Sequence, residues 1–221
     1  QTSMKVFTQK TYTTIKDANN EEEIMKNIFM KYPDIEDRTN GLETFIFSID
    51  SNTTSDFDDA FSIRYHDDVK QVSSYTLSIY ISNVSVYLDS LELWEYMSDR
   101  VSTIYLPDRK IPMIPTLLSE ELCSLCEHKC RVVFMSEYTI VDGCIEKIEF
   151  KNVAIRVQRN FVYNTLELTK HYAFKQMFNK VQSLNNKYPY MTSIKDSYDV
   201  VQYLMIFMNY HSSKELALHK Q

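Results

Sequence analysis

Glycine is scarce in this sequence. Gly41 and Gly143 are the two glycines among 221 residues, whereas average usage is about 7%. Neither a G-x-x-x-x-G-K-[ST] loop nor a G-x-G-x-x-G loop can be assembled from two glycines so far apart. The scarcity therefore excludes the glycine-rich phosphate cradles, together with collagen-like repeats and glycine-rich linkers.

Long apolar runs are also lacking. No stretch approaches the roughly 18 consecutive apolar residues of a membrane-spanning helix. The N-terminal sequence QTSMKVFTQK has no apolar core of a secretory signal. We therefore expect no membrane partner and a cytoplasmic protein, or one of the host cytoplasm or an organelle if a virus or organelle encodes it.

Positive charge is in deficit, with 24 lysines and arginines against 30 aspartates and glutamates, a net charge of −6. Proteins that bind nucleic acid are usually basic, because Lys and Arg release counterions from phosphates. The composition alone argues mildly against nucleic-acid binding, although an acidic metal site can dominate the sum. The 44% hydrophobic content of the chain is enough for the core of one domain.

The cysteines allow two interpretations. A C-x2-C-x3-C run and one later cysteine could form a zinc site. The last spacing is irregular and no second C-x-x-C pair follows, so reduced thiols in a cytosolic-type protein are favoured over zinc. The four residues are Cys123, Cys126, Cys130 and Cys144.

The first half of the chain predicts two short leading elements and then strands. Residues 1–20 are polar and predict an arm or a short strand. Acidic residues from Glu21 suit the positive end of a helix that Pro33 would stop. β-Branched and aromatic residues then predict strands. These strands are expected at 44–49, 60–65 and 75–82.

The second half predicts one hairpin and several helices. Asp142-Gly143 between two alternating runs is a strong hairpin signal. Helical spacing is present at 88–105, before a proline-rich extended loop, and again in two helices of 163–219 that divide near Pro189. We expect an α/β (α+β) fold with a mostly antiparallel mixed sheet and packed helices. The expected domains are an arm with a short helix at 1–43 and a main domain at 44–221.

Four aspartates within ten residues form the candidate chemical site. They lie at the end of one expected strand and the start of the next, and in an extended run alternate residues share a face. Carboxylates so close repel one another unless a cation neutralises them, and oxygen ligands favour Mg²⁺ or Mn²⁺. The alternative is a solvated loop of turn-forming residues. The four residues are Asp50, Asp56, Asp58 and Asp59.

This segment resembles the signature of the ribonuclease II catalytic domain, the RNB family. Ser48-Ile49-Asp50 and the following Asp56-Phe57-Asp58-Asp59-Ala60 keep the spacing of that signature. The string from Arg100 to Pro115 is similar to R-x2-S-x-Y-x-P-D-R-x-I-P-M-L-P, and Leu122-Cys123-Ser124-Leu125 to L-C-S-L. About residues 44–215 align in order, so the resemblance implies the N-terminal part of an RNB domain. It also implies that Cys123 is a packing residue.

The resemblance implies an enzyme that hydrolyses single-stranded RNA processively from the 3′ end, releasing nucleoside 5′-monophosphates with the help of two Mg²⁺ ions. The four aspartates would bind the metals, Asp58 and Asp59 would be catalytic, and Asp58 would be least replaceable. Tyr105 and Tyr163 match tyrosines on the RNA path, where stacking tolerates any base. Arg109 is carried over with this RNA-binding set, although pairing with Asp108 or holding the loop is the favoured role.

The chain also departs from the family pattern. Asn83 replaces an aspartate and Tyr80 replaces a histidine. The later S-P-I-R-R-Y-x-D signature, whose arginines clamp the phosphate, and the flanking oligonucleotide-binding barrels are not found. We expect another segment or chain to supply them. The alternative function is a non-catalytic RNB-like scaffold or RNA-binding subunit. A hydrolase with a Ser-His-Asp or Cys-His centre is a distant third, because no histidine has that context.

Overall fold

A computed structural model describes residues 3–18, 21–39, 44–66 and 74–218. Its centre is a seven-stranded sheet in the order β1-β8-β7-β4-β3-β2-β9. Strands β2, β3, β4, β7 and β8 pair antiparallel wherever they are neighbours, and the edge pairs β1–β8 and β2–β9 are parallel. The predicted mostly antiparallel α/β fold is confirmed. The strands are β1 (Glu36–Asp37), β2 (Phe47–Asp50), β3 (Asp59–Tyr65), β4 (Ser74–Ser82), β7 (Cys130–Val141), β8 (Cys144–Arg156) and β9 (Arg159–Val162).

The central strand β4 is covered on both faces. Its alternating sequence places Leu77 and Ile79 in one apolar cluster and Tyr80 in another. The buried Tyr80 hydroxyl lies 3.0 Å from the Ser62 hydroxyl of the neighbouring strand, so its polar end is satisfied. The alternate side chains of β4 therefore face two buried layers, and neither face of the strand is open to solvent.

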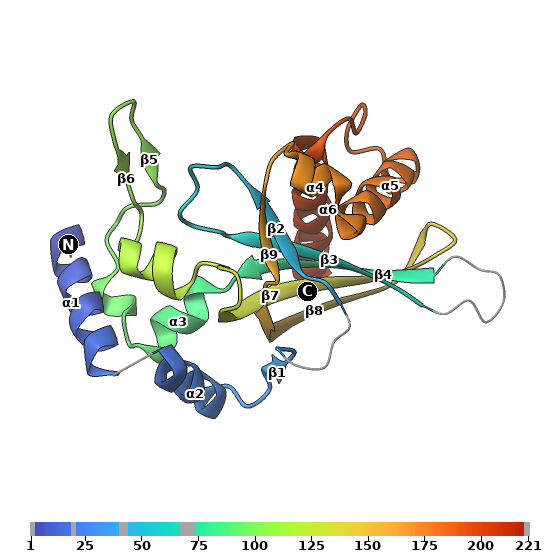
Figure 1. The fold of residues 1–221 in the computed structure, drawn as a ribbon. Helices are drawn as coiled ribbons and strands as arrows, with labels where there is room; N and C mark the ends of the chain where they lie inside the picture. Colours follow the sequence, from blue (N-terminus) through green and yellow to red (C-terminus); the bar gives the residue numbers. More distant parts are fainter. Residues whose placement is uncertain (1–2, 19–20, 40–43, 67–73, 219–221) are drawn as a thin grey trace.

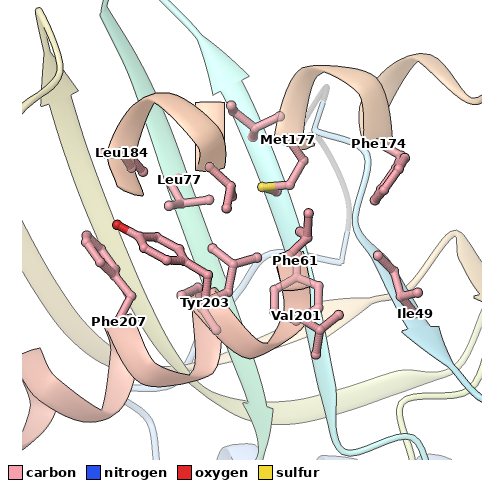
Figure 2. Packing of buried hydrophobic residues seen from close by; sticks show 14 of the residues in the cluster. Ile49, Phe61, Leu77, Phe174, Met177, Leu184, Val201, Tyr203 and Phe207 are labelled. Atoms are coloured by element: carbon pink, nitrogen blue, oxygen red, sulfur yellow. The ribbon is translucent and has the colours of Figure 1, made fainter. Parts of the chain in front are cut away.

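The C-terminal helices cover one face of the sheet (Figure 1). They are α4 (Leu166–Lys170), α5 (Tyr172–Lys187) and α6 (Ser197–Leu218). Figure 2 shows strand residues Phe61 and Leu77 facing Met177 of α5 and Tyr203 of α6. The predicted pair of helices on either side of Pro189 is confirmed, and α4 is an addition to it. No helix in the described part of the chain is both long and apolar enough to cross a membrane.

The N-terminal segment folds as a helix rather than as an arm or a strand. Helix α1 (Met4–Asp17) begins where the Ser3 hydroxyl accepts a hydrogen bond from the Val6 amide. Its Phe7 is fully buried in an apolar cluster with α2 (Glu21–Lys31) and α3 (Val84–Ser90). The prediction for residues 1–20 was therefore wrong, because tertiary burial of one aromatic face overrides a polar composition. The helix predicted from Glu21 is confirmed.

The helix predicted over 88–105 is mostly wrong. Asn83 caps α3, which begins earlier and ends at Ser90. Leu91 and Leu93 are then buried by a tight turn in which the Leu93 amide donates to the Leu88 carbonyl at 2.8 Å. A one-turn helix η1 (Trp94–Tyr96), the two-stranded ribbon β5 (Ile104–Tyr105) and β6 (Lys110–Ile111), and the π-helical turn η2 (Leu117–Leu122) follow.

The β7–β8 hairpin forms as predicted. Asp142 and Gly143 have φ angles of 48° and 71°, the left-handed conformation that a two-residue hairpin loop requires at both positions. All four cysteines are free thiols, and Cys123 is buried in the cluster beneath α1–α3. Its packing role, implied by the family resemblance, agrees with this position.

Candidate functional site

The four aspartates lie at one end of the sheet. Asp50 is the last residue of β2 and Asp59 the first of β3. Because these strands pair antiparallel, the end of one lies beside the start of the other. Asp56 and Asp58 are on the connecting loop, which lies between the β5–β6 ribbon and helices α4–α6 (Figure 1). The fold thus brings together the carboxylates that the spacing predicted to be neighbours.

Hydrogen bonds to the segment after η2 and to the end of β4 hold this loop. The Phe57 amide donates to the Ser124 hydroxyl at 3.0 Å, and the Leu125 amide donates to the Phe57 carbonyl at 2.8 Å. The Ser82 amide donates to the Asp58 carbonyl, also at 2.8 Å. The L-C-S-L segment therefore fixes the backbone on which Asp58 stands.

Asp50 is positioned by strand β9. The Tyr163 amide donates to the Asp50 carbonyl at 3.0 Å, just beyond the parallel β2–β9 pairing. The Asn160 side-chain amide donates to the Ser48 hydroxyl at 2.9 Å and to the Leu125 carbonyl at 3.0 Å. Asn160 thereby links β2 to the segment that also fixes the Asp58 loop.

Burial and mutual repulsion raise the pKa of three of the aspartates. Burial, followed by the charges of Asp58 and Asp56, raises the pKa of Asp50 to about 6, although a hydrogen bond from Ser48 opposes the rise. Burial and then Asp50 and Asp58 raise the pKa of Asp59 to about 7. The pKa of Asp58 is raised by burial and by Asp56, against the effect of Lys110.

Two buried carboxylate oxygens of this group have no hydrogen-bond partner in the described part of the chain. They are Asp50 Oδ2 and Asp59 Oδ2. An unpartnered buried carboxylate oxygen is destabilising unless a cation or a proton neutralises it. The donor chemistry of the site therefore fits a hard divalent cation.

Lys110 is a cation of the site that sequence reasoning missed. Its Nζ atom donates to Asp56 Oδ2 at 2.7 Å and lies 3.4 Å from Glu120 Oε1. Burial works to lower the pKa of Lys110, but Asp56 and Glu120 overcome that effect and raise it. Lys110 stands inside the P-D-R-K-I-P string, and the pattern contained no signal that its side chain would reach the aspartates.

The aspartates are near one another without forming a finished ligand set. Within the described ranges, no three His, Cys, Asp or Glu side chains are grouped closely enough to hold a metal ion. One of them, Asp56, is engaged by Lys110. The metal-binding role of the four aspartates stays a prediction.

Tyr105 and Arg109 lie on the β5–β6 ribbon. The Tyr105 side chain is 73% exposed, and its backbone pairs with Lys110. Arg109 is exposed, and its carbonyl accepts from the Leu106 amide at 2.9 Å across the turn of the ribbon. The structure thus leaves both side chains on the outside of a projecting ribbon, and their RNA-binding roles stay predictions.

Tyr163 lies beside the aspartates and stacks on a second tyrosine. Its ring is 3.9 Å from that of Tyr198, centroid to centroid, with 11° between the planes. Burial, followed by the charges of Asp59 and Asp50, raises the pKa of Tyr163. Tyr198 is 54% exposed, and as one aromatic residue in a polar stretch it gave no signal in the sequence.

The two departures from the family pattern have structural roles in this chain. The Asn83 side-chain oxygen accepts from the Ser85 hydroxyl at 2.7 Å and caps α3, and its amide donates to Asn152 at 2.8 Å. An aspartate could make the cap but could not donate to Asn152. Tyr80 is buried against Ser62 and fills the core.

Comparison with known proteins gives one family. The sequence profile of the RNB domain matches residues 38–204. Exoribonuclease 2 of Aeromonas hydrophila is 35% identical over 130 residues, which are 58% of this chain and 19% of that protein. The chain therefore spans about a fifth of the length of this curated relative.

Solved structures share the fold at low sequence identity. Mycoplasma genitalium RNase R in complex with double-stranded RNA superposes with a TM-score of 0.68 and 18% identity, over 86% of this chain and 39% of the other. Yeast Ssd1, a pseudonuclease, superposes with a TM-score of 0.59 and 15% identity, over 72% of this chain and 20% of the other. At these identities the likeness concerns the fold alone.

Proposed function

The chain belongs to the RNB domain family, and from this premise we propose that it is the aspartate-bearing part of a 3′→5′ exoribonuclease. Its substrate would be single-stranded RNA and its products nucleoside 5′-monophosphates. The observation that carries the proposal is that Asp50, Asp56, Asp58 and Asp59 lie together where β2 ends and β3 begins. Their spacing in the sequence is that of the family signature. The match to a relative named exoribonuclease 2 supports it.

The proposed cofactor is Mg²⁺, with Mn²⁺ as a substitute. Asp50, Asp56, Asp58 and Asp59 would hold it. When bound, two such ions would activate the attacking water and stabilise the leaving oxygen. The unpartnered Oδ2 atoms of Asp50 and Asp59 support this assignment, because they provide buried oxygen ligands that no donor of the described residues uses.

Each side chain of the site has a proposed task that follows from its position. Asp58 stands on a loop whose backbone is fixed by Ser82, and with Asp59 it would be catalytic. Tyr163 lies beside the aspartates and would support the terminal nucleotides by stacking. Tyr105 and Arg109, on the exposed ribbon, would contact RNA from the opposite side of the loop.

Further protein is part of the proposal, because the chain spans about a fifth of its relative. We expect another segment or chain to supply the arginines that clamp the phosphate and the oligonucleotide-binding domains. We place the assembled enzyme in the cytoplasm, or in the host cytoplasm or an organelle if a virus or organelle encodes it.

A non-catalytic RNB-like scaffold or RNA-binding subunit is the second candidate. It is favoured by one contact, the ion pair that places Lys110 on Asp56 at 2.7 Å. An ammonium group there neutralises a carboxylate that the nuclease would use for metal. The fold itself leaves this candidate open, because it is shared with yeast Ssd1, a pseudonuclease.

The deciding experiment is hydrolysis of 5′-labelled single-stranded RNA by the complete natural assembly with Mg²⁺. We expect stepwise shortening from the 3′ end and release of nucleoside 5′-monophosphates. Asp58→Asn should abolish the release while leaving RNA binding in place. Absence of mononucleotides, or release that Asp58→Asn does not reduce, would favour the scaffold.

A further inference from the structure

A pocket of about 420 Å³ lies among the helices that follow β9 in the chain. Asn164 and Ser197, the chain neighbours of Tyr163 and Tyr198, contribute to its wall. The remaining wall comes from α4, α5 and the segment before α6, in the group of helices above β9 (Figure 1). The volume is in the range of small-ligand sites, about 300–1,000 Å³.

The charged groups of the pocket leave it basic. Lys175 and Lys195 line it with exposed side chains, and neither has an ion-pair partner among the described residues. The one carboxylate in the wall belongs to Asp196, whose Oδ1 accepts from the Tyr198 amide at 2.9 Å and from the Asp199 amide at 3.2 Å. Two unpaired ammonium groups in a chain of net charge −6 point to an anionic ligand.

The other walls suit a nucleotide better than a simple anion. Phe174 and Phe178 form an apolar side, and Asn179 offers an exposed amide with both donor and acceptor groups. Tyr198 is not part of the wall but is the chain neighbour of the wall residue Ser197, and its ring is 54% exposed while it stacks on Tyr163. Cations beside aromatic rings are the usual means of binding single-stranded nucleic acid without sequence preference.

A chain of hydrogen bonds connects the pocket to the aspartate site. The Asn164 amide donates to the Ser197 hydroxyl at 3.0 Å, and that hydroxyl donates back to Asn164 Oδ1 at 2.8 Å. Asn164 takes the left-handed conformation, with φ of 56°, to make this link. One residue earlier, the Tyr163 amide donates to the Asp50 carbonyl at 3.0 Å.

We propose that this pocket and the exposed part of Tyr198 form a subsite for a nucleotide of single-stranded RNA upstream of the bond to be hydrolysed. Lys175 and Lys195 contact backbone phosphates there, and Tyr198 stacks a base. The inference rests on the proposed function, because that function supplies an RNA strand whose 3′ end lies at the aspartates. The subsite extends the strand path from Tyr163 onto the C-terminal helices.

The test is a binding measurement on the full 221-residue chain carrying Asp58→Asn, so that RNA is not consumed. The probe is a fluorescein-labelled 12-nucleotide oligouridine, followed by anisotropy over a range of salt concentrations. Lys175→Gln with Lys195→Gln should weaken binding about 10-fold at low salt. The salt slope should fall by about 1.4, because each phosphate contact on a single strand contributes about 0.7.

Two controls distinguish RNA binding at the subsite from nonspecific attraction to positive charge, and a third measurement excludes loss of the fold. Lys5→Gln with Lys16→Gln removes two exposed charges on α1 and should change affinity less than 2-fold. Tyr198→Ala should weaken binding about 10-fold, in the range of one stacked base, whereas Tyr198→Phe should retain wild-type affinity. Circular dichroism and thermal unfolding confirm that each variant is folded.

The outcomes distinguish the subsite from the proposed function. If the Lys175/Lys195 variant behaves like the α1 control while the parent chain binds RNA, the subsite is refuted and the exoribonuclease proposal stands. If the parent chain binds no single-stranded RNA, the subsite is refuted, whereas the exoribonuclease proposal is decided by the complete assembly. Polyglutamate binding that needs the two lysines but is indifferent to Tyr198→Ala would identify an acidic-peptide surface and overturn the nucleotide assignment.

Discussion

Lys110 Nζ lies 2.7 Å from Asp56 Oδ2, so an ion pair ties the β5–β6 ribbon to the loop that carries the aspartates. Both side chains are about three-quarters buried, with 25% and 23% exposed. The pair places a positive charge among carboxylates that would otherwise repel one another. It also means that a metal ion that uses Asp56 must displace an ammonium group.

We predict that Lys110→Met strengthens the binding of Mn²⁺ about 3- to 10-fold. Removal of the ammonium frees Asp56 and raises the negative potential of the site, in keeping with the strength of half-buried charge pairs. Isothermal titration calorimetry at pH 7.5 measures the effect. Lys110→Arg keeps the charge and serves as the matched control. Weaker or unchanged binding in Lys110→Met would assign the lysine a purely structural role.

The pH dependence of stability follows from the raised pKa values of Asp50 and Asp59, about 6 and about 7. Both exceed the value of an unfolded aspartate, about 3.9. Between these limits the folded state binds more protons than the unfolded state, so stability falls as the pH rises. We predict that, with EDTA present, the free energy of unfolding decreases from pH 5 to pH 7.5. Urea denaturation at these pH values measures it.

The same experiment has a specific control in Asp59→Asn. This variant lacks the carboxylate with the higher pKa and should show a shallower decline between pH 5 and pH 7.5. Mg²⁺ at pH 7.5 should restore stability to the wild-type chain and less to the variant, because a ligand of the folded state stabilises it by mass action. A pH-independent stability in EDTA would contradict the prediction.

Arg131 is predicted to be a major stabilising residue. Its side chain is 3% exposed and donates hydrogen bonds to the carbonyls of Ser124, Cys130 and Glu121, as well as to the Glu21 carboxylate. Arg131→Met leaves these acceptors unpaired and should lower the free energy of unfolding by about 3 kcal/mol. Lys129→Met removes the exposed partner of Glu21 and should change it by about 0.5 kcal/mol or less. Equal losses would contradict the assignment.

Helix α1 is predicted to be part of the folded core. Phe7 is fully buried, whereas the adjacent Val6 is 50% exposed. Phe7→Ala should therefore destabilise the chain by about 3–5 kcal/mol. Val6→Ala should have an effect of about 0.5 kcal/mol or less. Chemical denaturation of the two variants compares them, and a small effect of Phe7→Ala would show that α1 does not remain packed in solution.

The sequence was informative where local pattern and tertiary structure agree. Asp142-Gly143 can adopt the two positive φ angles of the hairpin, and the strands on either side alternate. The positions of Asp50 and Asp59 followed from their places at the end and the start of neighbouring strands. These features depend on backbone preferences that each residue carries with it.

The rest depends on contacts between distant segments. Phe7 finds its partners in α2 and α3, and no local signal in a polar stretch reveals that. Lys110 meets Asp56 across 54 residues, and Tyr198 meets Tyr163 across the whole α4–α5 unit. Leu91 is buried by a turn rather than a helix because the Asn83 cap shifts α3 toward the N-terminus. Such pairings are set by the packing of the complete domain.

The parallel pairing of β2 with β9 has a consequence for the order of folding. Asn160 reaches back 112 residues to the hydroxyl of Ser48, so this pairing closes a long loop. Closure of long loops is entropically expensive and slows folding. During synthesis, the strand that carries Asp50 can pair with β9 only after the chain beyond Val162 has left the ribosome. The four aspartates are thus expected to reach their native geometry late in the folding of the nascent chain.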